Sequence, residues 1–191
     1  TVKNQLLTSL STLKASVELK DNLLRFQQDF YKNAINEAES DAYLIAKPND
    51  PFLLNEVGKI LKQHQIEFYR PNEDVQFNGK KVEQNEAFVI PKKQKQSRLL
   101  EAMFEDRTEF IDSLFYDVSA FSFKHSFGLE MKKDYKPRKL GSKIETLSVT
   151  ASKQLEKSDY AYILRWSDFN APKALYKILD AGLRPRVATK E

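Results

Sequence analysis

Apolar residues recur with heptad-like spacing through the first 38 residues of the chain. They are Leu6, Leu10, Leu13, Val17, Leu24, Tyr31, Ala34 and Ala38. Neither Pro nor Gly interrupts this stretch, so the spacing predicts one long helix or two helices in line. One continuous helix would be about 55 Å long at ~1.5 Å per residue. We therefore expect it to pack as an antiparallel pair or against another domain, with Asp21 capping a second helix if the chain breaks there.

Two features distinguish this apolar stripe from a coiled-coil seam. Lys20 and Gln27 interrupt the heptad positions, and further apolar residues lie beside those positions. The flanking residues are Leu7, Leu23, Phe26 and Phe30. The pattern therefore favours a broad packed face over a strict two-stranded seam.

From residue 40 onward, short apolar runs that suit buried strands alternate with helical patterns. The runs predict strands at 41–46, 66–69, 87–90, 160–164 and 186–188, and helices at 51–64, 96–104, 108–114 and 172–181. Asp50 followed by Pro51 suits a helix start, Asn78-Gly79 suits a two-residue hairpin turn, and Gly182 suits a helix end. Two successive strand–helix–strand patterns are typical of a parallel or mixed sheet that is covered on both faces.

The expected architecture follows from this order of elements. We expect an α/β fold, a three-layer sandwich with a mostly parallel, flavodoxin-like sheet, preceded by a long N-terminal helical arm. The arm would cover residues 1–39 and the α/β domain residues 40–191. The last expected strand ends close to residue 191, which suggests a domain that is truncated at its C-terminus.

Positive charge is concentrated in one window. The chain has 31 Lys+Arg and 27 Asp+Glu, a formal charge of +4. Between Lys132 and Lys143 six cations face one anion, Asp134. A nucleic-acid surface would interleave such charges with stacking aromatics, whereas this window has only Tyr135 and contains Pro137. We therefore predict a solvated, mobile loop and no nucleic-acid partner. Binding of this loop to an anionic lipid or glycan surface is a further alternative.

Composition and motif searches remove several functional classes. With 0 Cys the chain has no disulfide framework, no thiol nucleophile and no cysteine-ligated zinc. No apolar run approaches the ~18 residues that a membrane span needs. No glycine-rich phosphate loop occurs, which leaves a nucleotide cradle unsupported.

Two catalytic constellations can be assembled from the sequence, and both are weak. His64, Glu67 and His125 offer zinc-ligand chemistry, but His64 ends a predicted helix while Glu67 lies in a predicted strand. A hydrolase-like set falls in one local segment without a nucleophile elbow, which suggests turn-capping residues. That set is Asp117, Ser119, Ser122 and His125. We expect no catalytic residue, no metal site and no cofactor in this chain.

Polar residues at predicted strand ends are the candidate ligand contacts. In open α/β sheets, ligands bind beyond the carboxyl ends of the strands. The candidates there are Lys92, Arg165, Trp166 and Asp168, with Lys47 at a similar position. Trp166 beside Arg165 could stack a sugar or clamp a carboxylate, or it could simply cover the following helix.

Several longer stretches carry a family resemblance. They are Tyr43-Leu44-Ile45, Phe88-Val89-Ile90-Pro91, Gln96-x-x-Leu99-Leu100, Met103-Phe104-Glu105-x-Arg107-Thr108, Asp112-Ser113-Leu114-Phe115-Tyr116-Asp117-Val118-Ser119, Arg165-Trp166-Ser167-Asp168-x-x-Ala171-Pro172-x-Ala174-Leu175-Tyr176 and Val187-Ala188-Thr189. These stretches resemble the region after the catalytic domain in large bacterial zinc carboxypeptidases of the carboxypeptidase A type. The resemblance covers most of the chain, including the helical arm more weakly.

The resemblance implies a class I glutamine amidotransferase-like fold and export to the periplasm or cell envelope. It also implies that the zinc ligands, the carboxylate-clamping arginine and the catalytic glutamate belong to a peptidase domain outside this sequence. The chain departs from true glutamine amidotransferases because it has no cysteine nucleophile. It departs from the resembling proteins at Phe121-Ser122-Phe123, where a Trp-Thr-Leu type of run is expected.

The hypothesis is a non-catalytic accessory domain of a zinc carboxypeptidase-like protein. Its arm would dock on the metallopeptidase domain of the same polypeptide, and its α/β domain would shape substrate access or bind peptide or glycan. The alternative is a free-standing α/β module that binds an anionic peptide or glycan through Lys92, Arg165 and Trp166. A third class, an enzyme in its own right, lacks an adequate constellation of residues.

Overall fold

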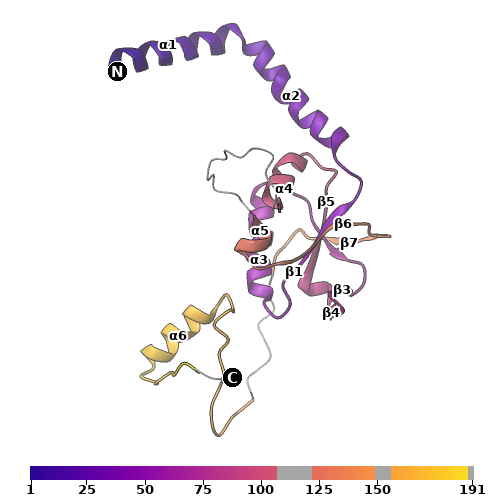
Figure 1. Ribbon diagram of the computed structural model, residues 1–191, viewed down its shortest axis with the longest axis vertical. Coiled ribbons are helices and arrows are strands. Elements are labelled where there is room, and N and C mark those ends of the chain that lie inside the picture. Colours follow the sequence, from indigo (N-terminus) through magenta and orange to yellow (C-terminus); the bar gives the residue numbers. More distant parts are fainter. Residues whose placement is uncertain (107–121, 149–155, 189–191) are drawn as a thin grey trace, which may run out of the picture.

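The computed structural model describes residues 1–106, 122–148 and 156–188. Its centre is a five-stranded sheet in the order β6-β1-β5-β2-β7 (Figure 1). The strands are β1 (Ala42–Ala46), β2 (Tyr69–Pro71), β5 (Ala87–Pro91), β6 (Glu130–Tyr135) and β7 (Leu140–Lys143). A separate hairpin consists of β3 (Val75–Phe77) and β4 (Lys80–Val82), and is followed by the 3-10 helix η1 (Gln84–Glu86). The helices are α1 (Val2–Glu18), α2 (Lys20–Glu37), α3 (Pro51–Gln63), α4 (Ser97–Met103), α5 (Phe123–Ser126) and α6 (Ala171–Asp180).

The sheet is antiparallel, which overturns the expected fold. Every neighbouring pair of strands in it runs antiparallel. Because β1 and β2 both pair with β5, they point the same way but are not neighbours. The strand–helix–strand pattern of β1, α3 and β2 fits this split arrangement as well as a parallel pair, since the pattern gives direction and not adjacency. The prediction of a mostly parallel three-layer sandwich, flavodoxin-like or glutamine amidotransferase-like, is therefore wrong.

Side chains of alternating direction build a different core on each face of the sheet. On β1, Tyr43 and Ile45 face the helices, whereas Ala42, Leu44 and Ala46 face the β3–β4 hairpin. The first core includes residues of α3, α4 and α5, and the second consists of residues from strands β1, β3, β4 and β5 with Tyr135 and Leu140 packed against it. Among the described residues, helices therefore cover one face of this sheet only.

Three local predictions are confirmed. The Asp50 carboxylate accepts a hydrogen bond from the Leu53 amide at 3.0 Å, and Pro51 begins α3. Asn78 and Gly79 have φ angles of 49° and 78°, as a type I′ hairpin turn requires. Gly182 has a φ of 71° after α6, and the Leu183 amide donates back to the Ile178 carbonyl at 3.1 Å.

Other local predictions are wrong. The window from 132 to 143 is not a single loop, because it contains most of β6 and all of β7. Its lysines gave no strand signal, but backbone pairing does not depend on them, and lysines are common on edge strands that must not pair with other chains. Residues 160–164 and 186–188 form no strand and are exposed. The expected helix at 108–114 lies outside the described residues, as do Phe115, Tyr116 and Phe121.

The short connection between β6 and β7 requires a curled sheet. In a flat five-stranded sheet the edge strands would be about 19 Å apart, at ~4.8 Å per strand. The chain from Tyr135 to Leu140 spans at most about 18 Å even when fully extended. Both flanking residues pack against the second core, and β7 approaches β2 so closely that a Cβ on Gly141 would lie 2.4 Å from the Arg70 carbonyl oxygen.

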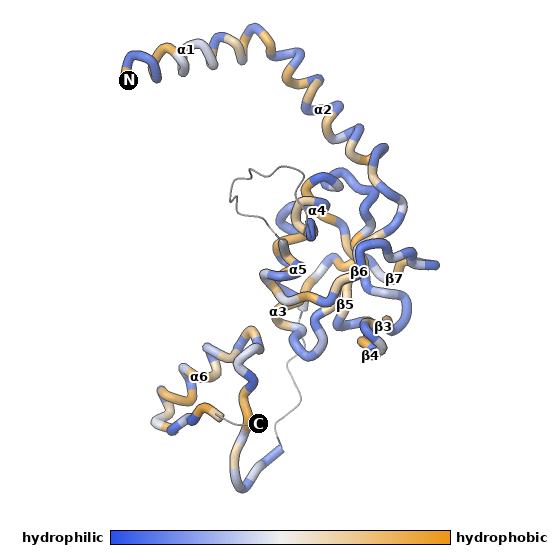
Figure 2. The backbone as a smooth tube through the Cα atoms, in the orientation of Figure 1, coloured by the Kyte–Doolittle hydropathy of each residue, from blue (hydrophilic) through white to orange (hydrophobic). Residues whose placement is uncertain are grey.

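The N-terminal arm, α1 with α2, extends away from the sheet and does not fold back into a pair (Figure 1). It bends at Leu19, while Asp21 lies in the first turn of α2 and makes no capping hydrogen bond. Apolar residues recur along both helices (Figure 2), and in α1 none is buried. The described helices include none with the length and apolar character that crossing a membrane requires.

Candidate functional site

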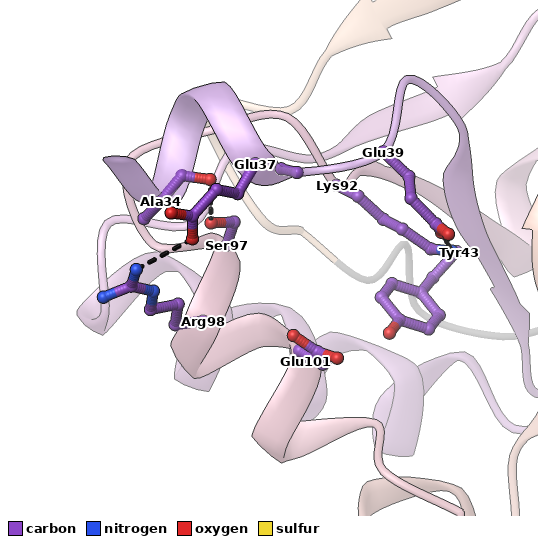
Figure 3. Close-up of a pocket in the computed structure, with 9 residues that line it drawn as sticks. Ala34, Glu37, Glu39, Tyr43, Lys92, Ser97, Arg98 and Glu101 are labelled. Carbon is purple, nitrogen blue, oxygen red and sulfur yellow. Dashed lines mark hydrogen bonds and ion pairs between the residues drawn. The ribbon is translucent and has the colours of Figure 1, made fainter. Parts of the chain in front are cut away.

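A pocket of about 310 Å³, which we call the junction pocket, lies where the end of α2 meets α4 and β1 (Figure 3). Its lining residues are Ala34, Glu37, Ala38, Glu39, Tyr43, Lys92, Ser97, Arg98 and Glu101. The junction is held by the Ser97 hydroxyl, which is buried and donates to the Ala34 carbonyl at 2.8 Å. The arm and the sheet therefore contribute to one site, although they are separated in sequence.

Arg98 closes the side of the pocket between the two helices. Its guanidinium forms an ion pair with Glu37 at 2.9 Å (Figure 3). The same group lies 4.3 Å from the centre of the Phe30 ring, a cation–π contact. Both contacts tie α4 to the last turns of α2.

Lys92 is the centre of an ion-pair cluster on the other side. Its ammonium lies 2.6 Å from Glu39, 3.0 Å from Asp41 and 3.4 Å from Asp134. The side chains of Lys92 and Asp41 are 14% and 8% exposed. Burial works against the charge of Lys92, but its hydrogen bonds to these carboxylates outweigh burial and raise its pKa above the ordinary value.

The carboxylates of this cluster have a spacing that a metal ion could use. Oxygens of Glu39, Asp41 and Asp134 all lie within 4.8 Å of one another. The Lys92 ammonium contacts all three, so it already supplies the compensating positive charge. The arrangement is an internal ion-pair network, and Lys92 is committed to it rather than free for an anionic ligand.

Tyr43 forms the floor of the pocket. It is 6% exposed, its ring stacks on Phe104 at 5.1 Å, and the Lys92 ammonium lies 5.2 Å from the ring centre. Its hydroxyl points towards Glu101 (Figure 3) and makes no hydrogen bond with any described residue. Burial raises the pKa of this hydroxyl; Lys92 lowers it, and the nearby Glu101 raises it further.

The predicted ligand contacts do not come together. Trp166, Arg165 and Asp168 precede α6, and none of them lines the pocket that contains Lys92. Trp166 is 65% exposed. This segment approaches the sheet domain, which comprises strands β1 to β7 with α3, α4 and α5. The contact is near the start of α3, where the Phe169 amide donates to Asp50 at 2.8 Å. An antiparallel sheet has no single edge of carboxyl ends, which removes the reason for expecting these residues to converge.

The two catalytic constellations are not assembled by the described residues. His64 follows the last turn of α3, and His125 lies 2.8 Å from Asp106. Neither histidine belongs to a metal-ligand cluster in the described part of the chain. Asp117 and Ser119 lie outside the described residues. Hydrogen bonds from Lys124 and His125 lower the pKa of Asp106 to about 2.

The turn between β6 and β7 holds three cations without an ion-pair partner among the described residues. Lys136, Arg138 and Lys139 have no acidic partner within residues 1–106, 122–148 and 156–188, whereas Lys143 pairs with Glu67 at 2.7 Å. The three line a broad hollow together with Glu39, Asp41 and Pro91. Lys92 does not line this hollow.

Sequence reasoning missed Tyr43, Glu101 and the partners of Lys92. Their contacts join residues 42 to 53 positions apart, so no local spacing encodes them. Two weak signals existed: Asp41 is an acid at the start of a wholly apolar strand, and Asp134 is the single anion in the basic window.

Comparison with known proteins adds no relative. No family model matches the chain, and neither does any curated protein or solved structure. The resemblance to the zinc carboxypeptidase region therefore stays a prediction.

Proposed function

We propose that this chain is a non-catalytic accessory domain of a zinc carboxypeptidase-like protein, and that its arm docks on the metallopeptidase domain of the same polypeptide. The observation that supports this most is the apolar surface of the arm. Leu6, Leu10 and Leu13 on α1 are all more than half exposed. Large apolar patches of this kind mark interaction surfaces in soluble proteins.

The apolar surface continues across the bend at Leu19. Leu23, Leu24 and Phe26 on α2 are at least half exposed, while Ala34 is buried against α4. The end of α2 is thus used to anchor the arm, and the rest of it is left to contact a partner. The partner's identity comes from the resemblance, as does a periplasmic or envelope location.

The sheet domain supports a role beside a catalytic centre. Lys92 and Arg98, the cations of its junction pocket, are held in ion pairs, and His125 is held by Asp106. We infer that this domain positions the arm and shapes access to the neighbouring peptidase domain, where peptide or glycan would reach it.

The docking proposal can be tested with single cysteines, because the chain has none of its own. Leu10→Cys places a thiol on the apolar face of α1, and Thr8→Cys places one on the opposite face by helical spacing. Maleimide labelling of each variant is measured with and without the peptidase domain encoded in the same reading frame. We expect labelling at position 10 to slow about tenfold or more and labelling at position 8 to change little. Equal rates at position 10 would contradict docking.

The non-catalytic assignment has its own test. The chain alone should not turn over peptide or ester substrates. Measurable turnover that is lost in His64→Ala or His125→Ala would show a catalytic site and would defeat the accessory assignment. Adding zinc should leave the melting temperature unchanged, because neither histidine lies in a cluster of metal ligands within the described part of the chain.

A further inference from the structure

We propose that the junction pocket between α2, α4 and β1 binds a small ligand that carries a primary ammonium or guanidinium group, with Glu101 and Tyr43 receiving that group (Figure 3). This inference does not rest on the accessory function. It concerns a site of which Lys92 alone was predicted from a strand end, and neither Tyr43 nor Glu101 was predicted.

The position of the Tyr43 hydroxyl is the first argument. The Tyr43 side chain is more than nine-tenths buried, and its hydroxyl makes no hydrogen bond with a described residue but is open to the pocket, where water or a ligand can bond to it. A ligand N–H placed between Tyr43 and Glu101 would donate to the hydroxyl oxygen.

The balance of charge is the second argument. Three carboxylates and two cations line the pocket. Arg98 is paired with Glu37, and Lys92 is paired with Glu39 as well as with two further carboxylates outside the lining. Glu101 is exposed and has no ion-pair partner among the described residues, so it is the lining carboxylate whose charge is not already compensated. The surplus negative charge favours a cationic over an anionic ligand.

Size and lining restrict the ligand further. About 310 Å³ lies at the small end of the range for ligand pockets, which is roughly 300–1,000 Å³. Ala34 and Ala38 supply a short apolar wall beside the polar groups. A few methylene groups that end in a cation fit this lining, as in a diamine, agmatine or the side chain of a lysine or arginine.

The experiment is calorimetric titration of the full chain with agmatine as the probe. We expect Glu101→Gln to weaken binding about tenfold or more, because it removes a charge-assisted hydrogen bond. Tyr43→Phe keeps the ring that packs on Phe104 and deletes only the hydroxyl, so we expect a several-fold loss in a folded protein. Glu83→Gln, on an exposed glutamate that lines none of the pockets described above, is the matched control and should bind as the unchanged chain does.

Three outcomes would overturn the proposal. The first is no binding at millimolar agmatine. The second is equal binding of pentanoate, which carries the opposite charge on a similar stem. The third is agmatine binding that survives both Glu101→Gln and Tyr43→Phe and disappears at about 0.15 M salt, which would indicate diffuse surface attraction. Melting curves of each variant separate loss of binding from loss of folding.

Discussion

The sheet domain and the N-terminal arm use the same kind of apolar residue to different ends. Leu100 on α4 is 0% exposed because α4 packs on the sheet beside Tyr43 and Phe104. Leu10 on α1 is 54% exposed because nothing in the described chain covers that face. An amphipathic pattern thus specifies that a helix has an apolar face, but the partner of that face is a separate property of the structure.

The segment before and through α6 belongs with the arm in this comparison. Trp166, Tyr176 and Leu179 are all more than half exposed. Its connection to the sheet domain among the described residues includes the hydrogen bond from Phe169 to Asp50. Exposed apolar residues therefore occur towards both ends of the chain, whereas the sheet between them is well covered.

The largest expected effect contrasts two leucines on two helices. Leu100→Ala should lower the free energy of unfolding by about 2–5 kcal/mol, because it removes a fully buried side chain and leaves a cavity. Leu10→Ala should change it by less than about 0.5 kcal/mol in the chain alone. Urea unfolding followed by circular dichroism measures both.

The same pair of variants can show that the exposure of α1 does not hold in solution. A loss of more than about 1 kcal/mol in Leu10→Ala would mean that α1 is covered in solution, by a second copy of the chain or by another segment. A concentration dependence of that loss would identify a second copy as the partner.

The parts of the fold that could be predicted from the sequence are those that depend on adjacent residues. Asp50 with Pro51 predicted the start of α3, and Asn78 with Gly79 predicted the hairpin turn. Neighbours in the sheet could not be predicted, because β5 inserts between β1 and β2 through contacts that are distant in sequence. Parallel order was inferred from an element sequence that both arrangements share.

The candidate site was harder to predict than the fold. The position of Lys92 after a predicted strand indicates a ligand contact, and Lys92 does line the junction pocket. The reason was nevertheless wrong, since the lysine is held by three carboxylates. Tyr43 was hidden within an apolar run, where an aromatic residue normally signals core packing.

A second, smaller effect concerns how the sheet domain closes at β7. Gly141→Ala places a methyl group 2.4 Å from the Arg70 carbonyl oxygen and 2.9 Å from that of Pro71, both of which are backbone atoms. We expect a loss of about 1–3 kcal/mol, because the strands must move apart. Gly79→Ala meets no atom within 4 Å and strains only a left-handed turn, so its loss should be about 1 kcal/mol. A loss in Gly141→Ala that is smaller than the loss in Gly79→Ala would contradict the close approach of β7 to β2.

The smallest effect should appear only in acid and should again separate the sheet domain from the arm. Hydrogen bonds from Lys124 and His125 lower the pKa of Asp106 to about 2, below its ordinary value of 3.8. The carboxylate therefore contributes stability above pH 3.8, and this contribution is lost as the pH falls towards 2. Asp106→Asn should accordingly show a shallower decline of unfolding free energy over that range than the unchanged chain. Asp29→Asn, at an exposed position on α2, should leave the decline as it is. Identical acid profiles for the unchanged chain and Asp106→Asn would mean that the Asp106 pairing does not persist in solution, and that this part of the sheet domain is no more constrained than the arm.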